Sequence, residues 1–236
     1  MSGTARRRIY LMRHGAVAYF DDAGHPVAPD TVPLTEEGRA QAEAARDLLE
    51  GVVPDRVIAS GLPRTMETAA IVAPGRAIEE WPELQEIRSA RLSSIPAAEV
   101  EEAFVHAFRG IVRNDKRFLG GETIGSLFDR VLPALDRLVT DDGWDTTLLV
   151  LHGAVNRAIL SYALTGERIF LGQFEQAPGC VNVLDVRVLD GRAEWIVRAV
   201  NVAAGDLAHT GTRMTTMEEY WERYRESESE GRRPGT

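Results

Sequence analysis

Short apolar runs alternate with longer stretches of helical periodicity along this 236-residue chain. Runs of mostly apolar residues predict buried strands, at residues 9–12, 56–59, 77–80 and 147–151. Between them apolar residues recur every three or four positions and predict amphipathic helices, which begin near Thr35, Pro63, Glu122 and Gly153. Strands that alternate with helices favour a parallel sheet with helices on both faces. We therefore predict the α/β class, as a three-layer αβα sandwich with a mostly parallel sheet.

Residues 88–121 interrupt the alternation of strands and helices and are predicted to form a small helical lid insertion. Its helix is expected to open at residue 94 or 95 and to carry an apolar stripe that includes Phe104 and Ile111. The helix after the insertion contains Pro133, which predicts a kink or a short break.

The last third of the chain completes one predicted domain. Two strands at residues 181–188 and 193–200 flank Asp190-Gly191, which is a strong hairpin signal. A final helix is predicted at residues 214–226, and the charged residues after it are expected to be disordered. The predicted organisation is a flexible N-terminal lead, a single α/β domain and a disordered tail, at residues 1–8, 9–226 and 227–236.

Composition narrows the class of protein. A formal net charge of −9 argues against a surface that binds nucleic acid or an anionic membrane, although it allows a local basic pocket for a phosphate. Cys180 is the only cysteine, which favours a reducing compartment. The apolar run after Arg8 is too short for a signal-peptide core, and no run is long enough to span a membrane. We predict a cytoplasmic protein without nucleic-acid or membrane partners; the sequence does not predict its oligomeric state.

Polar and charged residues gather where the predicted strands end. Arg13-His14-Gly15 follows the first strand, Leu84-Gln85-Glu86 the third and His152-Gly153 the fourth. The stretch from Ser60 to Ala69 runs from the second strand into a helix with Arg64 in its first turn. The carboxyl ends of parallel strands share one edge of a sheet, where α/β proteins bind ligands. A neutral imidazole is a nucleophile, and a guanidinium grips phosphate oxygens in a fork.

This set of motifs resembles that of the histidine phosphatase superfamily, in the branch that includes the phosphoglycerate mutases. The resemblance covers roughly residues 8–200 and keeps the motifs in order at the element boundaries. Besides Arg13-His14-Gly15 and the Ser60 stretch, the matching segments are Leu34-Thr35-Glu36-Glu37-Gly38, Gly120-Gly121-Glu122-Thr123 and Leu149-Val150-Leu151-His152-Gly153.

The resemblance implies a phosphohistidine mechanism without a metal or another cofactor, acting on a small phosphorylated substrate. His14 is expected to attack the substrate phosphorus in line. Glu86 is expected to protonate the leaving oxygen and then to activate the water that cleaves phosphohistidine. The phosphoryl oxygens are expected to be held by Arg13, Arg64, His152 and Gly153.

Without the resemblance, the residues support some of these roles more strongly than others. Arg64 has a structural alternative as a surface arginine at a helix start, and His152 as a core histidine. Glu79, Glu80 and Glu83 lie near Glu86, and the Leu-x-Glu pattern favours Glu86 among them. The candidate substrate contacts are Tyr19, Phe20, Arg88 and Arg91.

Three functions compete for this chain. Residues 87–121 look too short to seal a pocket while an intermediate reorients, which favours a phosphatase for a small phosphomonoester. The alternative is a 2,3-bisphosphoglycerate-dependent phosphoglycerate mutase; however, Ala16 stands where mutase-like members often have Glu or Ser. Phe20 also replaces an asparagine that family members often have. A non-catalytic module that binds a phosphorylated ligand is disfavoured because both histidines and both arginines are present.

Overall fold

A six-stranded sheet, in the order β3-β2-β5-β1-β7-β8, forms the centre of the molecule. The computed structural model describes residues 5–21, 27–91, 94–205 and 211–231. Strands β1 to β3 and β5 run parallel, while β7 is antiparallel to β1 and β8 is antiparallel to β7. Their bounds are Arg7–Arg13 for β1, Arg56–Ala59 for β2, Ile78–Glu80 for β3, Thr146–Leu151 for β5, Val181–Leu189 for β7 and Arg192–Val202 for β8.

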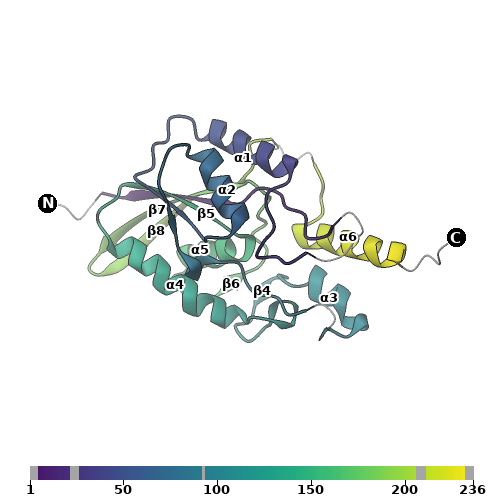
Figure 1. The fold of residues 1–236 in the computed structure, drawn as a ribbon. Coiled ribbons are helices and arrows are strands. Elements are labelled where there is room, and N and C mark those ends of the chain that lie inside the picture. Colours follow the sequence, from purple (N-terminus) through teal and green to yellow (C-terminus); the bar gives the residue numbers. More distant parts are fainter. Residues whose placement is uncertain (1–4, 22–26, 92–93, 206–210, 232–236) are drawn as a thin grey trace.

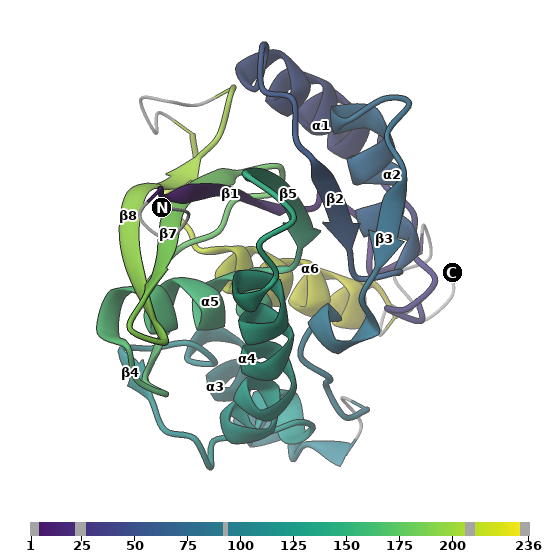
Figure 2. The same ribbon diagram turned by 90° about the vertical axis from the view of Figure 1, so that its left-hand side faces the viewer.

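Helices cover both faces of the sheet (Figures 1 and 2). Successive side chains of a strand point to opposite faces of the sheet, so the apolar residues of a central strand contribute to the cores on both faces. Leu11 of β1 belongs to the core on the α4 and α5 side, whereas Met12 belongs to the core under α1 and α2. The predicted three-layer sandwich is confirmed, and its helices are α1 (Glu36–Leu48), α2 (Pro63–Val72), α4 (Ile124–Thr140) and α5 (Gly153–Thr165).

Local sequence signals set the ends of these elements. The Thr35 hydroxyl caps α1 by accepting a hydrogen bond from the backbone N–H of Gly38 at 3.0 Å. Asp190 and Gly191 join β7 to β8 with φ angles of +50° and +72°, the left-handed pair that a two-residue hairpin turn requires. The predicted hairpin and helix start are therefore confirmed.

The insertion contains less helix than its apolar spacing predicts. Helix α3 spans only Val100–Val105 and is preceded by a 3₁₀ turn at Ala97–Glu99. Gly110 adopts a left-handed φ of +67°, which turns the chain away from a helical path. Ile111, predicted to lie on the apolar stripe, is instead 72% exposed in β4 (Ile111–Val112), which pairs with β6 (Phe170–Leu171).

Two other expected element bounds are wrong, and the break expected as one alternative at Pro133 is absent. Strand β1 begins at Arg7, inside the predicted lead. Helix α4 runs through Pro133 without interruption, since buried side chains before and after it, such as Phe128 and Leu135, hold it against the sheet. The last helix, α6, spans Thr216–Gly231 and therefore extends five residues into the stretch predicted to be disordered; residues 232–236 lie outside the described part.

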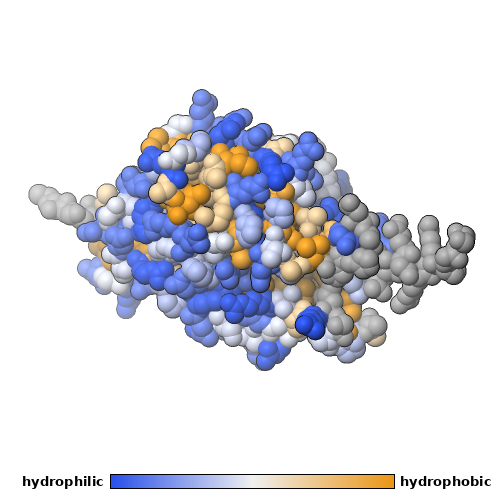
Figure 3. Space-filling model, in the orientation of Figure 1, coloured by the Kyte–Doolittle hydropathy of each residue, from blue (hydrophilic) through white to orange (hydrophobic). Residues whose placement is uncertain are grey.

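The face of the molecule seen in Figure 3 is mostly hydrophilic, with separate apolar patches in place of one continuous apolar area. In the part of the chain that the structure describes, no helix is long and apolar enough to cross a membrane. Helix α6 lies at one end of the molecule, on the same side as α3 and the loop that follows β1 (Figure 1). That end is the carboxyl edge of the parallel strands.

Candidate active site at the carboxyl edge of the sheet

The predicted site residues meet at the carboxyl edge of the sheet. His14 follows β1, Arg64 lies in the first turn of α2, and His152 follows β5. The chain reaches Glu86 from β3 through a 3₁₀ turn at Pro82–Leu84. The four basic side chains are almost inaccessible: His14 is 2% exposed, Arg64 1%, His152 0% and Arg13 5%.

The hydrogen bonds of His14 fix the proton on one ring nitrogen. Its Nδ1 lies 2.7 Å from the carbonyl oxygen of Gly15, which can only accept, so Nδ1 carries the hydrogen. The Nε2 atom accepts from Nε–H of Arg64 at 3.2 Å. The Nε2 lone pair is therefore the nucleophilic position, and a guanidinium lies directly beside it.

Glycine at position 15 allows the His14 loop to touch α1. A Cβ atom on Gly15 would lie 2.2 Å from the carbonyl oxygen of Gly38, and one on Gly38 would lie 2.1 Å from that of Ala16. The backbone N–H of Gly15 donates to Thr68 Oγ1 at 3.2 Å, and the same hydroxyl donates to the carbonyl of Arg64. These contacts join the first two sequence motifs, because Thr68 places the backbones of His14 and Arg64 together.

His152 faces His14, with the ring centroids 5.2 Å apart and the planes at 67°. Its Nε2 lies 2.7 Å from the Ser60 hydroxyl, which in turn lies 3.0 Å from the hydroxyl of Thr65. Its Nδ1 is buried and has no partner among the described residues. An unpaired buried nitrogen costs free energy unless a ligand pairs with it, so this atom is positioned for a ligand oxygen.

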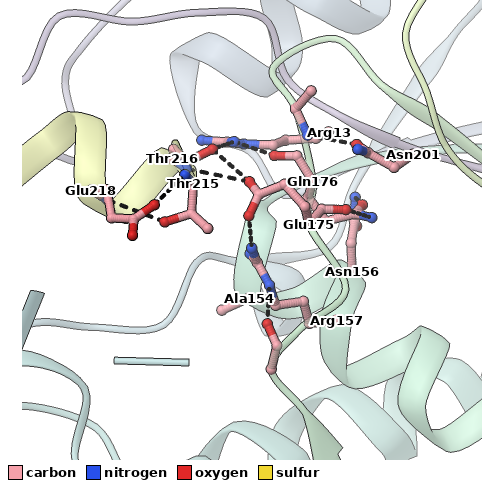
Figure 4. Close-up of polar contacts among 12 residues, drawn as sticks. Arg13, Ala154, Asn156, Arg157, Glu175, Gln176, Asn201, Thr215, Thr216 and Glu218 are labelled. Atoms are coloured by element: carbon pink, nitrogen blue, oxygen red, sulfur yellow. Dashed lines mark hydrogen bonds and ion pairs between the residues drawn. The ribbon is translucent and has the colours of Figure 1, made fainter. Parts of the chain in front are cut away.

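Arg13 has the same combination of fixed and unpaired nitrogens. Its Nη1 donates to the carbonyl of Gln176 and to the Thr216 hydroxyl (Figure 4). Its Nη2 donates to the Tyr220 hydroxyl. Its Nε is buried without a partner in the described part of the chain. The guanidinium is therefore held on its outer side, and Nε–H remains for an anion.

Gly153 leaves space between three charged groups. A Cβ atom at this position would lie 3.2 Å from Nη1 of Arg157 and 3.7 Å from both Arg13 Nε and Glu86 Oε2. The carboxylate of Glu86 accepts from the backbone N–H of Ala154 at 3.2 Å, in the first turn of α5. The helix N-terminus, two cations and one carboxylate thus surround the glycine, which suits phosphate and proton-transfer chemistry.

The electrostatics favour neutral imidazoles. Burial, with Arg64 and Arg13 close by, holds the pKa of His14 well below its usual 6.5. Burial, together with Arg64 and His14, has the same effect on the pKa of His152. The imidazole of His14 is therefore neutral near pH 7, and its Nε2 lone pair is available for nucleophilic attack. Within the described residues, no group of three or more His, Cys, Asp or Glu side chains is arranged to hold a metal ion.

Arg130 of α4 supports the loop that carries Glu86. Its guanidinium donates to the backbone carbonyls of Glu83, Gln85 and Glu86 and pairs with Glu122 at 2.8 Å. Glu122 also accepts from the backbone N–H of Arg88 at 3.0 Å. The role of Glu122 is structural, and it holds both ends of the acid loop in place.

The candidate substrate contacts divide into two groups. Tyr19 and Phe20 pack against α6: the Tyr19 ring meets Tyr220 edge-on at 5.4 Å, and Phe20 lies 6.3 Å from Tyr224. Arg88 and Arg91 are exposed, and neither side chain forms a hydrogen bond or ion pair that fixes it over the site within the described residues. The four residues therefore remain candidates with different surroundings.

Sequence reasoning missed the residues that hold the site from outside its motifs. None of them belongs to a strand-end pattern, although Arg157 lies four residues after Gly153, on the helix that the motif opens. They are Arg130, Arg157, Glu175, Gln176, Thr216 and Tyr220. Ser60 and Thr68 lie within the predicted stretch from Ser60 to Ala69, but its pattern does not specify their hydrogen bonds to His152 and Gly15.

Comparison with protein families matches residues 9–201 to the histidine phosphatase superfamily (branch 1). The match contains all the motifs at the sheet edge. The chain belongs to this superfamily. Helix α6 lies beyond the matched range, so part of the surroundings of Arg13 comes from outside the family's common region.

Known proteins align with this chain over about two thirds of its length or more. An adenosylcobalamin/alpha-ribazole phosphatase from Salmonella typhimurium is 29% identical over 80% of this chain and 98% of its own length. A glucosyl-3-phosphoglycerate phosphatase from Mycolicibacterium vanbaalenii is 31% identical over 68% of this chain and 75% of its own. The solved structure titled "Mycobacterial hydrolase 1" has the same fold, with a TM-score of 0.68, 21% identity and coverage of 84% of this chain and 99% of that one.

Proposed function

We propose that this protein is a phosphatase that hydrolyses a small phosphomonoester through a phosphohistidine at His14. The observation that carries the proposal is the combination at His14: an Nε2 lone pair beside Arg64, with two buried nitrogens, on Arg13 and His152, that have no partner among the described residues. Each of these N–H groups can donate a hydrogen bond, and the oxygens of a phosphoryl group provide several acceptors. Membership of the family and the names of the relatives support the same reaction.

In the first half-reaction Nε2 of His14 attacks phosphorus, and the bond from phosphorus to the ester oxygen breaks. Arg64 leaves the lone pair and turns its N–H groups to the phosphoryl oxygens, which Arg13 and His152 also hold. The carboxyl of Glu86 gives its proton to the departing alkoxide, which leaves as an alcohol.

In the second half-reaction a water molecule attacks the phosphohistidine. Glu86, now a carboxylate, takes a proton from that water as its oxygen bonds to phosphorus, and the P–N bond breaks. Inorganic phosphate forms, and the lone pair returns to Nε2 of His14. The backbone N–H of Ala154 holds the carboxylate of Glu86 at the start of α5 throughout.

The cover over the site favours hydrolysis over mutase chemistry. A mutase must exclude water from the phosphohistidine while an intermediate reorients. In the insertion, the described α-helix is the six-residue α3, and Arg88 and Arg91 are exposed. We propose a cytoplasmic setting, consistent with the buried Cys180, the chain's single cysteine, and a substrate that is a small phosphorylated molecule.

A substrate panel tests the reaction type. We expect phosphate release from an aryl phosphate and from several sugar, glycerate or nucleoside monophosphates. The same enzyme is supplied with 3-phosphoglycerate and catalytic 2,3-bisphosphoglycerate. Isomerisation faster than every hydrolysis would replace the phosphatase with a mutase, and activity on none of the substrates would favour a binding module.

A further inference from the structure

The residues predicted to hold the phosphoryl oxygens, Arg13, Arg64, His152 and Gly153, are called the phosphate clamp below. Helix α6 contacts Arg13 of this clamp, although the helix lies beyond residues 9–201, which match the family. The Thr216 hydroxyl accepts from Nη1 of Arg13 at 3.1 Å, and the Tyr220 hydroxyl accepts from Nη2 at 3.2 Å. Thr216 and Tyr220 lie 203 and 207 positions after Arg13 in the sequence. No motif at the sheet edge accounts for these contacts.

A chain of polar contacts joins the start of α6 to α5 (Figure 4). The Thr216 hydroxyl donates to one carboxylate oxygen of Glu175 at 2.8 Å. The other oxygen of Glu175 accepts from Nη2 of Arg157, which is 4% exposed, at 3.1 Å. Thr216 therefore links two arginines that border Gly153, and its hydroxyl uses both its donor and an acceptor position.

Aromatic packing holds α6 in this position from two sides. Trp221 and Tyr224 lie 6.1 Å and 5.8 Å from Phe104 of α3, and Met217 is buried among the same residues. On the other side Tyr19 meets the Tyr220 ring at right angles. Rings packed in this way fix the direction of the Tyr220 hydroxyl toward Arg13.

We propose that α6 is part of the active site and that Tyr220 is a positioning residue for Arg13. This inference rests on the proposed phosphatase function. Together with Thr216 and the carbonyl of Gln176, Tyr220 fixes the outer edge of the guanidinium, which leaves Nε–H directed at the phosphoryl group. Arginine recognises phosphate through a planar fork, so its orientation decides how well it binds.

The test compares Tyr220→Phe with Tyr224→Phe, which makes the same change one turn further along α6. Phenylalanine keeps the ring that packs, and thermal unfolding checks that each variant is folded. Orthovanadate binding is measured by calorimetry, since it needs no turnover. We expect Tyr220→Phe to bind orthovanadate about tenfold more weakly, the effect of losing a hydrogen bond to a charged group, and Tyr224→Phe to match the wild type.

Two further readouts separate positioning from a general loss of structure. Because Arg13 is proposed to contact the phosphoryl group and not the leaving group, kcat/KM should fall equally for aryl and alkyl phosphates. In an Arg13→Met background, Tyr220→Phe should change orthovanadate binding by less than about twofold, since Tyr220 would have no guanidinium to position.

The outcomes distinguish this inference from the proposed function. Wild-type protein that neither binds orthovanadate nor hydrolyses any ester would remove both. Wild-type binding that Tyr220→Phe leaves unchanged would overturn only the role of Tyr220. Tighter binding in Tyr220→Phe would also overturn it, because α6 would then restrain Arg13 in an unproductive position. A full effect retained in Arg13→Met would mean that Tyr220 acts through another group.

Discussion

The sheet edge and the cover above it are built in different ways. At the edge, His14, Arg64 and His152 are at most 2% exposed and are held by hydrogen bonds of 2.7 and 3.2 Å between neighbouring strand ends and helix starts. In the cover, α3, α6 and the loop after β1 meet mainly through aromatic rings, and the arginines of the insertion are exposed. We therefore propose that the edge performs the chemistry, while the cover orients the phosphate clamp and admits the substrate.

The largest expected difference between the two regions lies in their histidines. His14→Ala removes the nucleophile, so kcat should fall by about 10⁴ to 10⁶. His106→Ala makes the same change in the cover, just after α3, and should alter kcat less than twofold. Steady-state kinetics on an aryl phosphate measure both variants. Comparable losses in the two would contradict a division between chemistry and cover.

In the first half-reaction Glu86 should act on the leaving group, and kcat/KM reports that half-reaction. Glu86→Gln should reduce kcat/KM on alkyl phosphates by about 10² to 10³, and on aryl phosphates by less than about tenfold, because an aryl oxide leaves without a proton. Glu83→Gln is the control on the same loop, where Glu83 pairs with Arg137 at 3.0 Å. Equal losses on both substrate types would exclude Glu86 as the acid, and a selective loss in Glu83→Gln would assign the role to Glu83.

Arg130 tests whether the acid depends on its support. Arg130→Gln removes the hydrogen bonds to the carbonyls of the Glu86 loop, so the alkyl-to-aryl ratio of kcat/KM should fall about tenfold. Arg137→Gln, on the same helix, alters an exposed ion pair and should leave the ratio unchanged. A ratio that does not move in Arg130→Gln would show that the loop holds Glu86 without it.

The smallest expected effect is a pH dependence of stability. Since the folded-state pKa of His14 lies below its unfolded value near 6.5, unfolding takes up a proton below that pH. The contribution is complete above about pH 6.5 and is lost as the pH falls toward the folded pKa. Between pH 6.5 and 5.5 the wild type should lose about 1 kcal/mol more than His14→Ala in urea unfolding. Parallel losses would mean that His14 is protonated in the folded protein.

Sequence predicts the edge better than the cover for a physical reason. His14, Arg64 and His152 follow strands whose apolar runs are local signals, and parallel pairing brings the strand ends together. The insertion has an apolar spacing that fits a long helix, yet the left-handed Gly110 and the pairing of β4 with β6 end it early. Tyr220 and Thr216 contact Arg13 only through tertiary packing, so no local sequence pattern predicts these contacts.

The phosphohistidine can be observed by trapping it. Wild-type enzyme is mixed with a ³²P-labelled phosphomonoester, quenched in base and digested, and the labelled peptide is identified. We expect an acid-labile, base-stable label on His14, enriched in Glu86→Gln with an aryl phosphate because hydrolysis of the intermediate is slowed. A label on any other residue, or phosphate release by an enzyme that never carries the label, would contradict the covalent mechanism.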